Sequence, residues 1–427
     1  MIRSELALLL LTAVSTSAQQ ATPAAKPYAG LVTANTRFAF KLFHESVARG
    51  PEQNVLLSPT ALSLDFALLQ NAADTAARGQ IVSVFEFGDW SPETINEQSQ
   101  ALRHALIYDP VKPTSRAPRR HGVQPPPICC PAPPEHLALA GSLWVQPIVT
   151  FRRKFLETNE KFFGFKIASA PGKGAEGTRA VNDWVSKETR GQLTNALDSW
   201  RRDDFLVVDT TSFKGSWFRP FDESRTHRSD FTLFSGQKKS VNMMVQGGDY
   251  NYLRGDKFQA IRLNYGHAAM YVFLPDVDSD LPAFERSLTA DNWADWLSKM
   301  EEHEGSIELP RFSADYEGYV TKILVDLGMP LAFTSFQSFV PLVENPEGAR
   351  LTRVLQAVTI KVDEKGTEAA SATFIGGVIG GVSSGPRPTP FRMVVDHPFF
   401  FAICDDETNA ILYMGAINDP SPIPLAH

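Results

Sequence analysis

The spacing of apolar residues divides the chain into a first part rich in helices and a later part dominated by strands. Apolar side chains recur every three to four residues over 36–50 and 58–81, which predicts two amphipathic helices, and Ser58-Pro59 is a favourable helix start. A further helix is predicted over 179–193. Runs rich in β-branched and aromatic residues predict strands at 137–145, 205–213, 268–275, 305–312, 358–364 and 397–404. Because no strand-helix-strand alternation repeats, we expect an α+β fold.

The composition indicates a globular protein with a substantial core. Of the 427 residues, 43% are hydrophobic and 21% are charged, and the formal net charge is -7. This weak negative charge argues against a general nucleic-acid binder and against an acidic disordered chain. We therefore expect no nucleic-acid partner.

The N-terminus has the pattern of an export signal. Arg3 precedes the apolar run LALLLLTAV at 6–14, and small residues end at Ala18. A span across the bilayer needs about 18 apolar residues, which neither this run nor any later stretch reaches. We expect a signal peptide at 1–18, a flexible extension at 19–34, and a secreted, monomeric protein, extracellular or periplasmic, with no membrane partner. A retained membrane anchor is the alternative.

The cysteines do not form a disulfide framework. Cys129, Cys130 and Cys404 are an odd number, and two of them are adjacent. A disulfide between neighbours would be strained, because their α-carbons are only about 3.8 Å apart. Cys404 lies in the apolar run FFFAIC, which predicts a buried free thiol. Stability must therefore come from the core.

One segment, residues 110–134, differs in composition from the rest. It holds nine of the 30 prolines and no acidic residue, and its basic residues are Lys112, Arg116, Arg119 and Arg120. Such a segment is typical of a semi-rigid, partly polyproline surface excursion. It is a candidate site for an anionic polymer or another partner. The alternative is a tolerated disordered insertion.

No pattern typical of an active site is present in the sequence. Ser142 lies in AGSLW, a strand pattern, and His303 in EEHEG lacks the second histidine of a zinc-protease helix. The glycines of GGVIGG do not follow a strand and open a helix, as nucleotide-binding motifs require. We expect no catalytic residue, no metal site and no cofactor, and a secreted hydrolase is the least favoured function.

The stretch DEKGTEAASATFIGGVIGGVSSG at 363–385 combines two kinds of segment. Thr367, Ala369, Ser371 and Thr373 fall on one side of an extended chain, because side chains of a strand alternate. A strand with such a small face can enter between two existing strands without overpacking the core. The following glycines favour an exposed loop: Gly376, Gly377, Gly380, Gly381 and Gly385. A solvated linker is the alternative.

Several motifs, in this order, resemble those of the serpin family from about Asn35 to Pro420. The first three are NVLLSP at 54–59 (the start of the family's helix B), VNDWVSKETRGQL at 181–193 (helix F) and SFKGSWFRPFD at 212–222 (the strand opening the breach, with Trp217 at the family's tryptophan). MYVFLPD, IELPRF, DEKGTEAASAT and HPFFFAI complete the series. The resemblance implies the serpin fold over 35–427, with helices around a large, mainly antiparallel sheet A and smaller sheets B and C.

The resemblance also implies an inhibitor of proteases. In inhibitory serpins the segment matching DEKGTEAASAT is the hinge of an exposed reactive loop, here 364–390, which inserts into sheet A once it is cut. A target protease that forms its acyl-enzyme on the loop is then carried along and trapped. The alternative is a non-inhibitory serpin acting as a carrier, storage protein or chaperone. The implied hinge residues are Glu364, Gly366, Thr367, Glu368, Ala369, Ala370, Ser371, Ala372 and Thr373.

The family's usual spacing puts the scissile bond near Gly380-Gly381. No Lys or Arg lies between Gly366 and Pro386. This favours a target with a small apolar specificity pocket, either elastase-like or subtilisin-like, with papain-like cysteine proteases also open. The surrounding apolar residues are Val378, Ile379 and Val382.

The pattern of the family's shutter is changed at the centre of the sheet. Where serpins usually have an asparagine and a histidine in the shutter, at the centre of the sheet, this chain has Asp209 and Gln356. We assign these two residues, together with Ser58 and Trp217, to the shutter and breach. An Asp carboxylate that accepts from a Gln amide can still close a hydrogen-bonded pair. Without a partner, a buried Asp209 would cost several kcal/mol or shift its pKa.

Overall fold

A computed structural model describes residues 26–107, 136–170, 174–201, 205–277, 281–344, 348–367 and 389–420. Its α-helices are α1 (Ala29–Arg49), α2 (Pro59–Leu69), α3 (Thr75–Val84), α4 (Pro92–Ala105), α5 (Arg153–Thr158), α6 (Ala175–Glu188), α7 (Leu281–Ser287), α8 (Ala290–Ser298), α9 (Thr321–Asp326) and α10 (Leu331–Thr334). The strands are β1 (Val55–Leu57), β2 (His136–Val145), β3 (Lys166–Ser169), β4 (Leu206–Ser216), β5 (His227–Thr232), β6 (Lys238–Gly255), β7 (Phe258–Asn264), β8 (Ala268–Pro275), β9 (Glu301–Pro310), β10 (Phe312–Tyr319), β11 (Arg353–Asp363), β12 (Gly366–Thr367), β13 (Phe391–Val394), β14 (Phe399–Asp405) and β15 (Ile411–Ile417).

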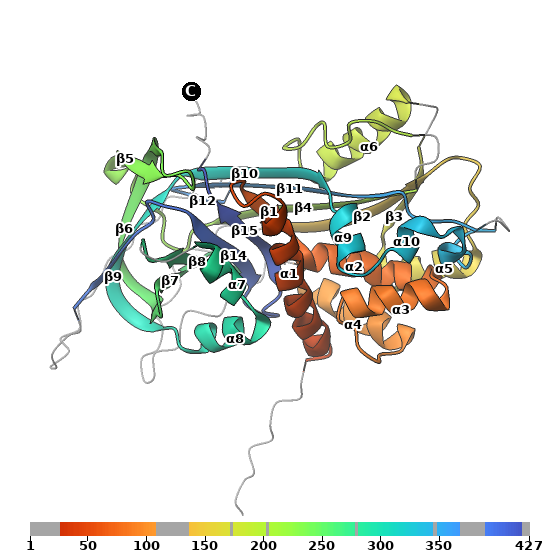
Figure 1. Ribbon diagram of the computed structural model, residues 1–427, viewed down its shortest axis with the longest axis horizontal. Helices are drawn as coiled ribbons and strands as arrows, with labels where there is room; N and C mark the ends of the chain where they lie inside the picture. Colours follow the sequence, from red (N-terminus) through yellow and green to blue (C-terminus); the bar gives the residue numbers. More distant parts are fainter. Residues whose placement is uncertain are drawn as a thin grey trace, which may run out of the picture.

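The described strands form two sheets. Six strands in the order β10-β11-β12-β4-β2-β3 make a mixed sheet, which we call sheet A (Figure 1). Within it, β4 pairs parallel with β11 and antiparallel with β2. The other sheet has nine strands in the order β1-β15-β14-β8-β7-β6-β9-β13, with β5 paired to β6. The expected smaller sheets are continuous here, because the 18-residue strand β6 pairs with β7, β9 and β5.

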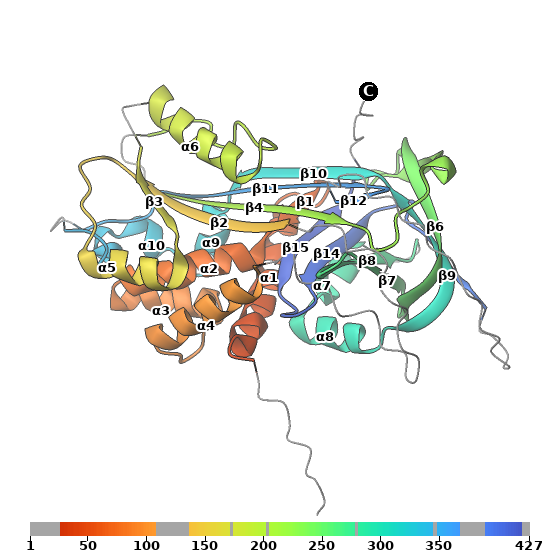
Figure 2. The ribbon, with the colours of Figure 1, turned by 180° about the vertical axis from the view of Figure 1, so that it is seen from behind.

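Helices cover both faces of sheet A. Helix α6 lies on one face, and α2 to α4 lie on the other (Figures 1 and 2). The main hydrophobic core is on the α2 side, and a separate cluster of twelve buried residues, including Val181, Trp200 and Leu355, lies between α6 and the sheet. Helix α2 is buried along its whole length, and ten of its eleven residues, all except Asp65, are apolar or small.

The predicted elements are present, with three differences in their limits. The helical pattern over 58–81 is two helices, because Asp74 accepts a hydrogen bond from the Ala77 amide and starts α3 anew. The run at 305–312 spans the end of β9 and the start of β10. The predicted extension at 19–34 is too long, since α1 begins at Ala29 and buries Leu31 at the core.

Two further observations concern the thiol of Cys404 and the length of the helices. Cys404 is a buried free thiol, as predicted, and burial raises the pKa of this thiol. Among the described helices, none combines the length and the apolar character needed to cross a membrane.

Candidate functional site

Sheet A contains a seam between β4 and β11 that a third strand enters at one end. The two strands pair directly, and in parallel, over 206–211 and 353–358. Farther along, β12 lies between them, with Thr367 opposite Gly215 on β4 and opposite Val362 on β11, antiparallel to both. The seam is therefore closed along six residue pairs and already parted where the predicted hinge begins.

Strand β12 fits between its neighbours because it starts at a glycine. Gly366 has a φ of +143°, and a Cβ on it would lie 2.2 Å from the carbonyl oxygen of Gly215. The next side chain, Thr367, is only 1% exposed, and its hydroxyl lies 2.6 Å from the hydroxyl of Tyr265. The small inward-facing residue predicted at 367 is thus anchored to the interior.

Trp217 holds the turn that leads from β11 into β12. Its indole N–H donates to the carbonyl of Asp363 at 2.8 Å, and its backbone amide donates to the carbonyl of Lys365 at 2.9 Å. The indole stacks on Tyr265 with a centroid distance of 4.3 Å and an interplanar angle of 12°. One aromatic pair therefore contacts both the turn and the inserted threonine.

A buried ion pair fixes the same turn from the other side. Glu364 is 2% exposed, and one carboxylate oxygen accepts from the Nη2 and Nε atoms of Arg311 at 2.6 and 2.7 Å. The hydroxyl of Thr226 donates to the same oxygen at 2.5 Å, and the Phe221 amide donates to the Glu364 carbonyl at 2.9 Å. The buried carboxylate is tolerated here because Arg311 and Thr226 stabilise it, while the Phe221 amide holds the backbone of Glu364.

The closed part of the seam carries a buried polar cluster at its centre. The Gln356 side-chain amide donates to Asp209 Oδ2 at 2.6 Å and to the Ser58 carbonyl at 3.1 Å. The Ser58 hydroxyl donates to the Leu412 carbonyl at 2.9 Å and accepts from the Thr211 hydroxyl at 2.8 Å. The pair expected between Asp209 and Gln356 is formed, and it bridges the seam from one strand to the other.

Asp209 remains an unusual residue for this position. It is fully buried, and burial raises the pKa of its carboxyl to about 7, although the hydrogen bond from Gln356 acts in the opposite direction. Its second oxygen, Oδ1, has no hydrogen-bond partner within the described chain. The Gln356 amide thus compensates only part of the cost of burying this carboxyl.

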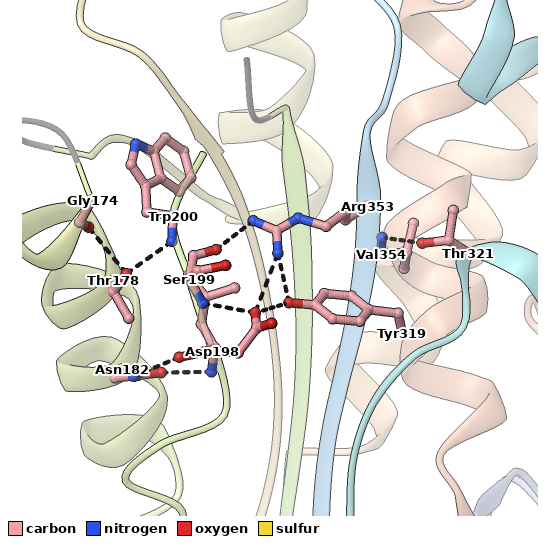
Figure 3. A network of polar contacts seen from close by, with 11 residues as sticks. Gly174, Thr178, Asn182, Asp198, Ser199, Trp200, Tyr319, Thr321, Arg353 and Val354 are labelled. Carbon is pink, nitrogen blue, oxygen red and sulfur yellow. Dashed lines mark hydrogen bonds and ion pairs between the residues drawn. The ribbon is translucent and has the colours of Figure 1, made fainter. Parts of the chain in front are cut away.

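A second polar network joins the far end of the seam to the segment after α6 (Figure 3). Arg353, at the start of β11, donates to the Ser199 carbonyl at 2.7 Å and to the Tyr319 hydroxyl at 2.6 Å. The Tyr319 hydroxyl donates in turn to Asp198 at 2.5 Å. This bond is the main cause that lowers the pKa of Asp198, whereas burial is the main cause that raises the pKa of Tyr319 to about 12.

The segment after α6 is tied to the helix as well. The Thr178 hydroxyl accepts from the Trp200 amide at 2.8 Å, and Asn182 exchanges hydrogen bonds of 3.0 and 2.7 Å with the backbone of Leu197 (Figure 3). Between helix and segment lies an open polar cleft of about 570 Å³. Within the described ranges, no group of three or more His, Cys, Asp or Glu side chains is placed to hold a metal ion.

Comparison with known proteins agrees with this architecture. The family Serpin (serine protease inhibitor) matches residues 33–420, which is most of the chain. The chain belongs to the serpin family. This serpin is 26% identical over 417 residues to plasminogen activator inhibitor 2 of Homo sapiens, covering 91% of this chain and 99% of the relative. It is 27% identical over 401 residues to antithrombin-III of Homo sapiens, covering 91% of this chain and 82% of that protein.

Solved structures show the same fold. The crystal structure of human thyroxine-binding globulin matches this serpin with a TM-score of 0.78 at 21% identity, covering 93% of this chain and 100% of that one. At this level of identity the similarity concerns the fold alone. The sheets and the helices that cover them are thus those of a serpin fold.

The structure brings the described site residues together in two groups along the seam. Ser58, Asp209 and Gln356 meet at its centre, and Trp217 lies beside the hinge residues Glu364, Gly366 and Thr367 at the parted end. Residues 364–367 open the segment 364–390 that was expected to be the hinge and reactive loop. These residues are part of the sheet or its turn, because Glu364 has a cation and Thr367 has a buried hydroxyl as partners.

The remaining predicted residues lie outside the described residues. They are the hinge positions Glu368, Ala369, Ala370, Ser371, Ala372 and Thr373, the scissile region Val378, Ile379, Gly380, Gly381 and Val382, the insertion at 110–134 with Cys129 and Cys130, and the signal peptide at 1–18.

Sequence reasoning missed three residues of the site. Arg311 lies in the quoted motif IELPRF, and a cation within a run that predicts a strand was a signal for a buried acidic partner. Tyr265 and Asp65, a buried acid of α2, gave no such signal, because tyrosines are buried or exposed with similar frequency and acids are mostly exposed.

Proposed function

We propose that this serpin inhibits proteases as a suicide substrate, with its cut reactive loop inserting along the seam of sheet A. The observation that carries the proposal is the position of β12, which already lies between β4 and β11 at one end of the seam. Insertion would extend β12 in the direction in which it already points. Small side chains at the inward positions of the hinge favour this over a carrier or storage role.

The pairing registers of β12 with β4 and β11 indicate which residues would lie opposite each other after insertion. Thr367 opposes Gly215 and Val362, and six residues farther on in the same antiparallel registers Thr373 comes opposite both Asp209 and Gln356. The threonine hydroxyl can donate to the carboxylate and accept from the amide. The bond that closes the seam would thus be replaced, rather than lost, when the strand enters.

Inhibition along this route uses the protease's own chemistry. The protease nucleophile attacks the carbonyl of the scissile bond, an acyl-enzyme forms, and the new amino terminus leaves. Insertion of about 14 residues at roughly 3.3 Å each would carry the attached protease some 45 Å. A displacement of about 1 Å in its active site is enough to slow deacylation severely. The uncut form is then held by a kinetic barrier.

The proposal extends to the class of the target protease and to the location of the inhibitor. We infer a secreted inhibitor whose target accepts small apolar residues around Gly380-Gly381, elastase-like or subtilisin-like, with a papain-like cysteine protease as a further candidate. The basic, proline-rich segment at 110–134 is the proposed contact for an anionic polymer. Arg387 is the first basic residue after the expected scissile region, and rapid, tight inhibition of trypsin through it would contradict this target class.

The first experiment does not need the target. The loop is nicked between Gly376 and Ser384 with a non-target protease, and the melting temperatures of intact and nicked protein are compared. An increase of tens of degrees is the expected result, because the inserted strand completes sheet A. An unchanged melting temperature would contradict insertion and favour a carrier, storage or chaperone function.

A second experiment tests the register. Thr373→Glu would place a further carboxylate against Asp209, so the cut loop should stop short and the protein should be consumed as a substrate. Glu368→Gln is the matched control, since residue 368 would face outward, opposite Lys214 and Lys361. Measured stoichiometries of inhibition should rise severalfold for the first variant only. An unaffected Thr373→Glu protein would contradict this register.

A further inference from the structure

A second buried acid lies next to Asp209. Asp65, on the wholly buried helix α2, is 4% exposed. Its Oδ1 atom occupies space at β2 that only a glycine leaves open, because a Cβ on Gly141 would lie 2.2 Å from it. Gly141 is the residue that pairs with Asp209 across β2 and β4. The two carboxyl groups therefore meet at the same point of sheet A, beside the seam.

The groups around this acid pair do not neutralise it fully. Asp65 Oδ2 and Asp209 Oδ1 are buried without a hydrogen-bond partner in the described part of the chain. Arg103 on α4 is the cation that acts on Asp65, and burial lowers the pKa of that arginine. From β11 the pair is faced by the neutral amide of Gln356, and from β2 by the glycine.

Both carboxyl groups hold protons more tightly than ordinary aspartates. Burial and then the charge of Asp209 raise the pKa of Asp65 well above its usual value, and Arg103 opposes them. Burial raises the pKa of Asp209 to about 7. Because the two sites interact, they titrate as a pair, and the pair retains protons near neutral pH that hydrated aspartates would have lost.

We propose that Asp65 and Asp209 form a proton-dependent clasp on the seam, so that sheet A opens more readily as the pH rises from mildly acidic values toward neutrality. Parting β4 from β11 removes the Gln356 amide and admits water to the acids. The opened sheet then releases a proton that the closed sheet binds. The clasp acts on the seam itself, whether or not a protease is trapped.

The sign of the pH dependence follows from the linkage between proton binding and the opening of the seam. The folded pKa values are raised above the hydrated value of about 3.9, so the closed seam is most favoured below that pH. Its advantage decreases as the pH rises toward the folded value of about 7 for Asp209. Each pH unit in this window changes the opening equilibrium by up to about tenfold for one proton released. The hydrogen bond from Gln356 favours the charged form and reduces this effect without reversing it.

Hydrogen exchange measures the opening directly. Amide protection over 206–211 and 353–358, corrected for the intrinsic exchange rate, should fall about tenfold or more between pH 5.5 and 7.5. This is within the limit for one released proton, which changes the opening equilibrium by up to about tenfold per pH unit. Amides of β7 and β8 serve as the internal reference, because these strands lie in the other sheet. A constant ratio between seam and reference over this pH range would overturn the proposal.

Neutral, nearly isosteric variants assign the effect to the pair. Asp65→Asn and Asp209→Asn should each flatten the pH profile, and the double variant should show none of the decrease. Asp315→Asn is the matched control, because this acid is on the exposed side of β10 in the same sheet and should keep the wild-type profile. If the double variant does not fold, the two single variants decide. An unchanged slope in Asp209→Asn would contradict the proposal.

Discussion

The two parts of the seam in sheet A differ in how well their polar groups are matched. At the parted end, Glu364 has Arg311 and Thr226, Thr367 has Tyr265, and the turn is bonded to Trp217. At the closed centre, two buried acids each leave an oxygen without a partner among the described residues. The end that is already open is thus electrostatically relaxed, and the closed part carries the strain. This difference favours further opening from the parted end toward the centre.

The largest effect is expected from removing the cation of the parted end. Arg311→Met would leave the Glu364 carboxylate buried with only Thr226, which costs about 3–5 kcal/mol for a broken buried pair. The midpoint of urea unfolding should fall accordingly. Arg392→Met is the matched control, because Arg392 is 70% exposed and its pair with Glu308 is a surface contact. Equal decreases of the urea midpoint in both variants would contradict the expected difference between the buried ion pair and the surface ion pair.

A smaller effect is expected at the closed centre. Ser58→Ala removes the acceptor of the Thr211 hydroxyl and the donor to Leu412, so a buried hydroxyl loses its partner at a cost of about 1–3 kcal/mol. Thermal unfolding of Ser58→Ala and of the double variant Ser58→Ala/Thr211→Val checks this. The double variant should be the more stable of the two, and the reverse order would show that Thr211 finds another partner.

The contact between hinge and interior should be weaker still. Tyr265→Phe deletes the hydroxyl that meets Thr367 and keeps the ring that stacks on Trp217, so about 1 kcal/mol is expected. Limited proteolysis should then cut the hinge faster, because β12 leaves the sheet more often. An unchanged cutting rate would mean that backbone pairing alone holds β12.

The smallest effect is expected at the partly exposed network between sheet A and the segment after α6. Tyr319→Phe removes the hydrogen bond that is the main cause of the lowered pKa of Asp198, so this pKa should rise toward its ordinary value. A lowered pKa stabilises the fold above the unfolded value and loses that contribution as the pH falls. The variant should therefore lose stability mainly at neutral pH, by well under 1 kcal/mol because Asp198 is 65% exposed. Carboxyl NMR titration measures the shift.

Local patterns in the sequence predicted much of the fold and part of the site. Alternation along an extended chain is a local property, and it placed Thr367 on the small-residue side of a strand before any partner was known. The pair of Asp209 and Gln356 was expected because the resemblance to serpins supplied the two positions. The ion pair of Arg311 and Glu364 joins residues 53 positions apart, and that of Arg353 and Asp198 joins residues 155 apart. Such contacts depend on strand order and register, which hydrophobic periodicity does not contain.

Helix α6 rests on its own small core. Twelve buried residues of the helix, of the segment after it and of sheet A form a cluster separate from the main one, and hydrogen bonds of the segment at 194–200 close its rim. A unit with few buried residues and an exposed polar boundary opens at a free energy well below that of global unfolding. Helix and segment should therefore behave as an independent foldon that lifts from sheet A while the rest stays native. The scaffold can thus clear the face above the seam repeatedly without risking denaturation.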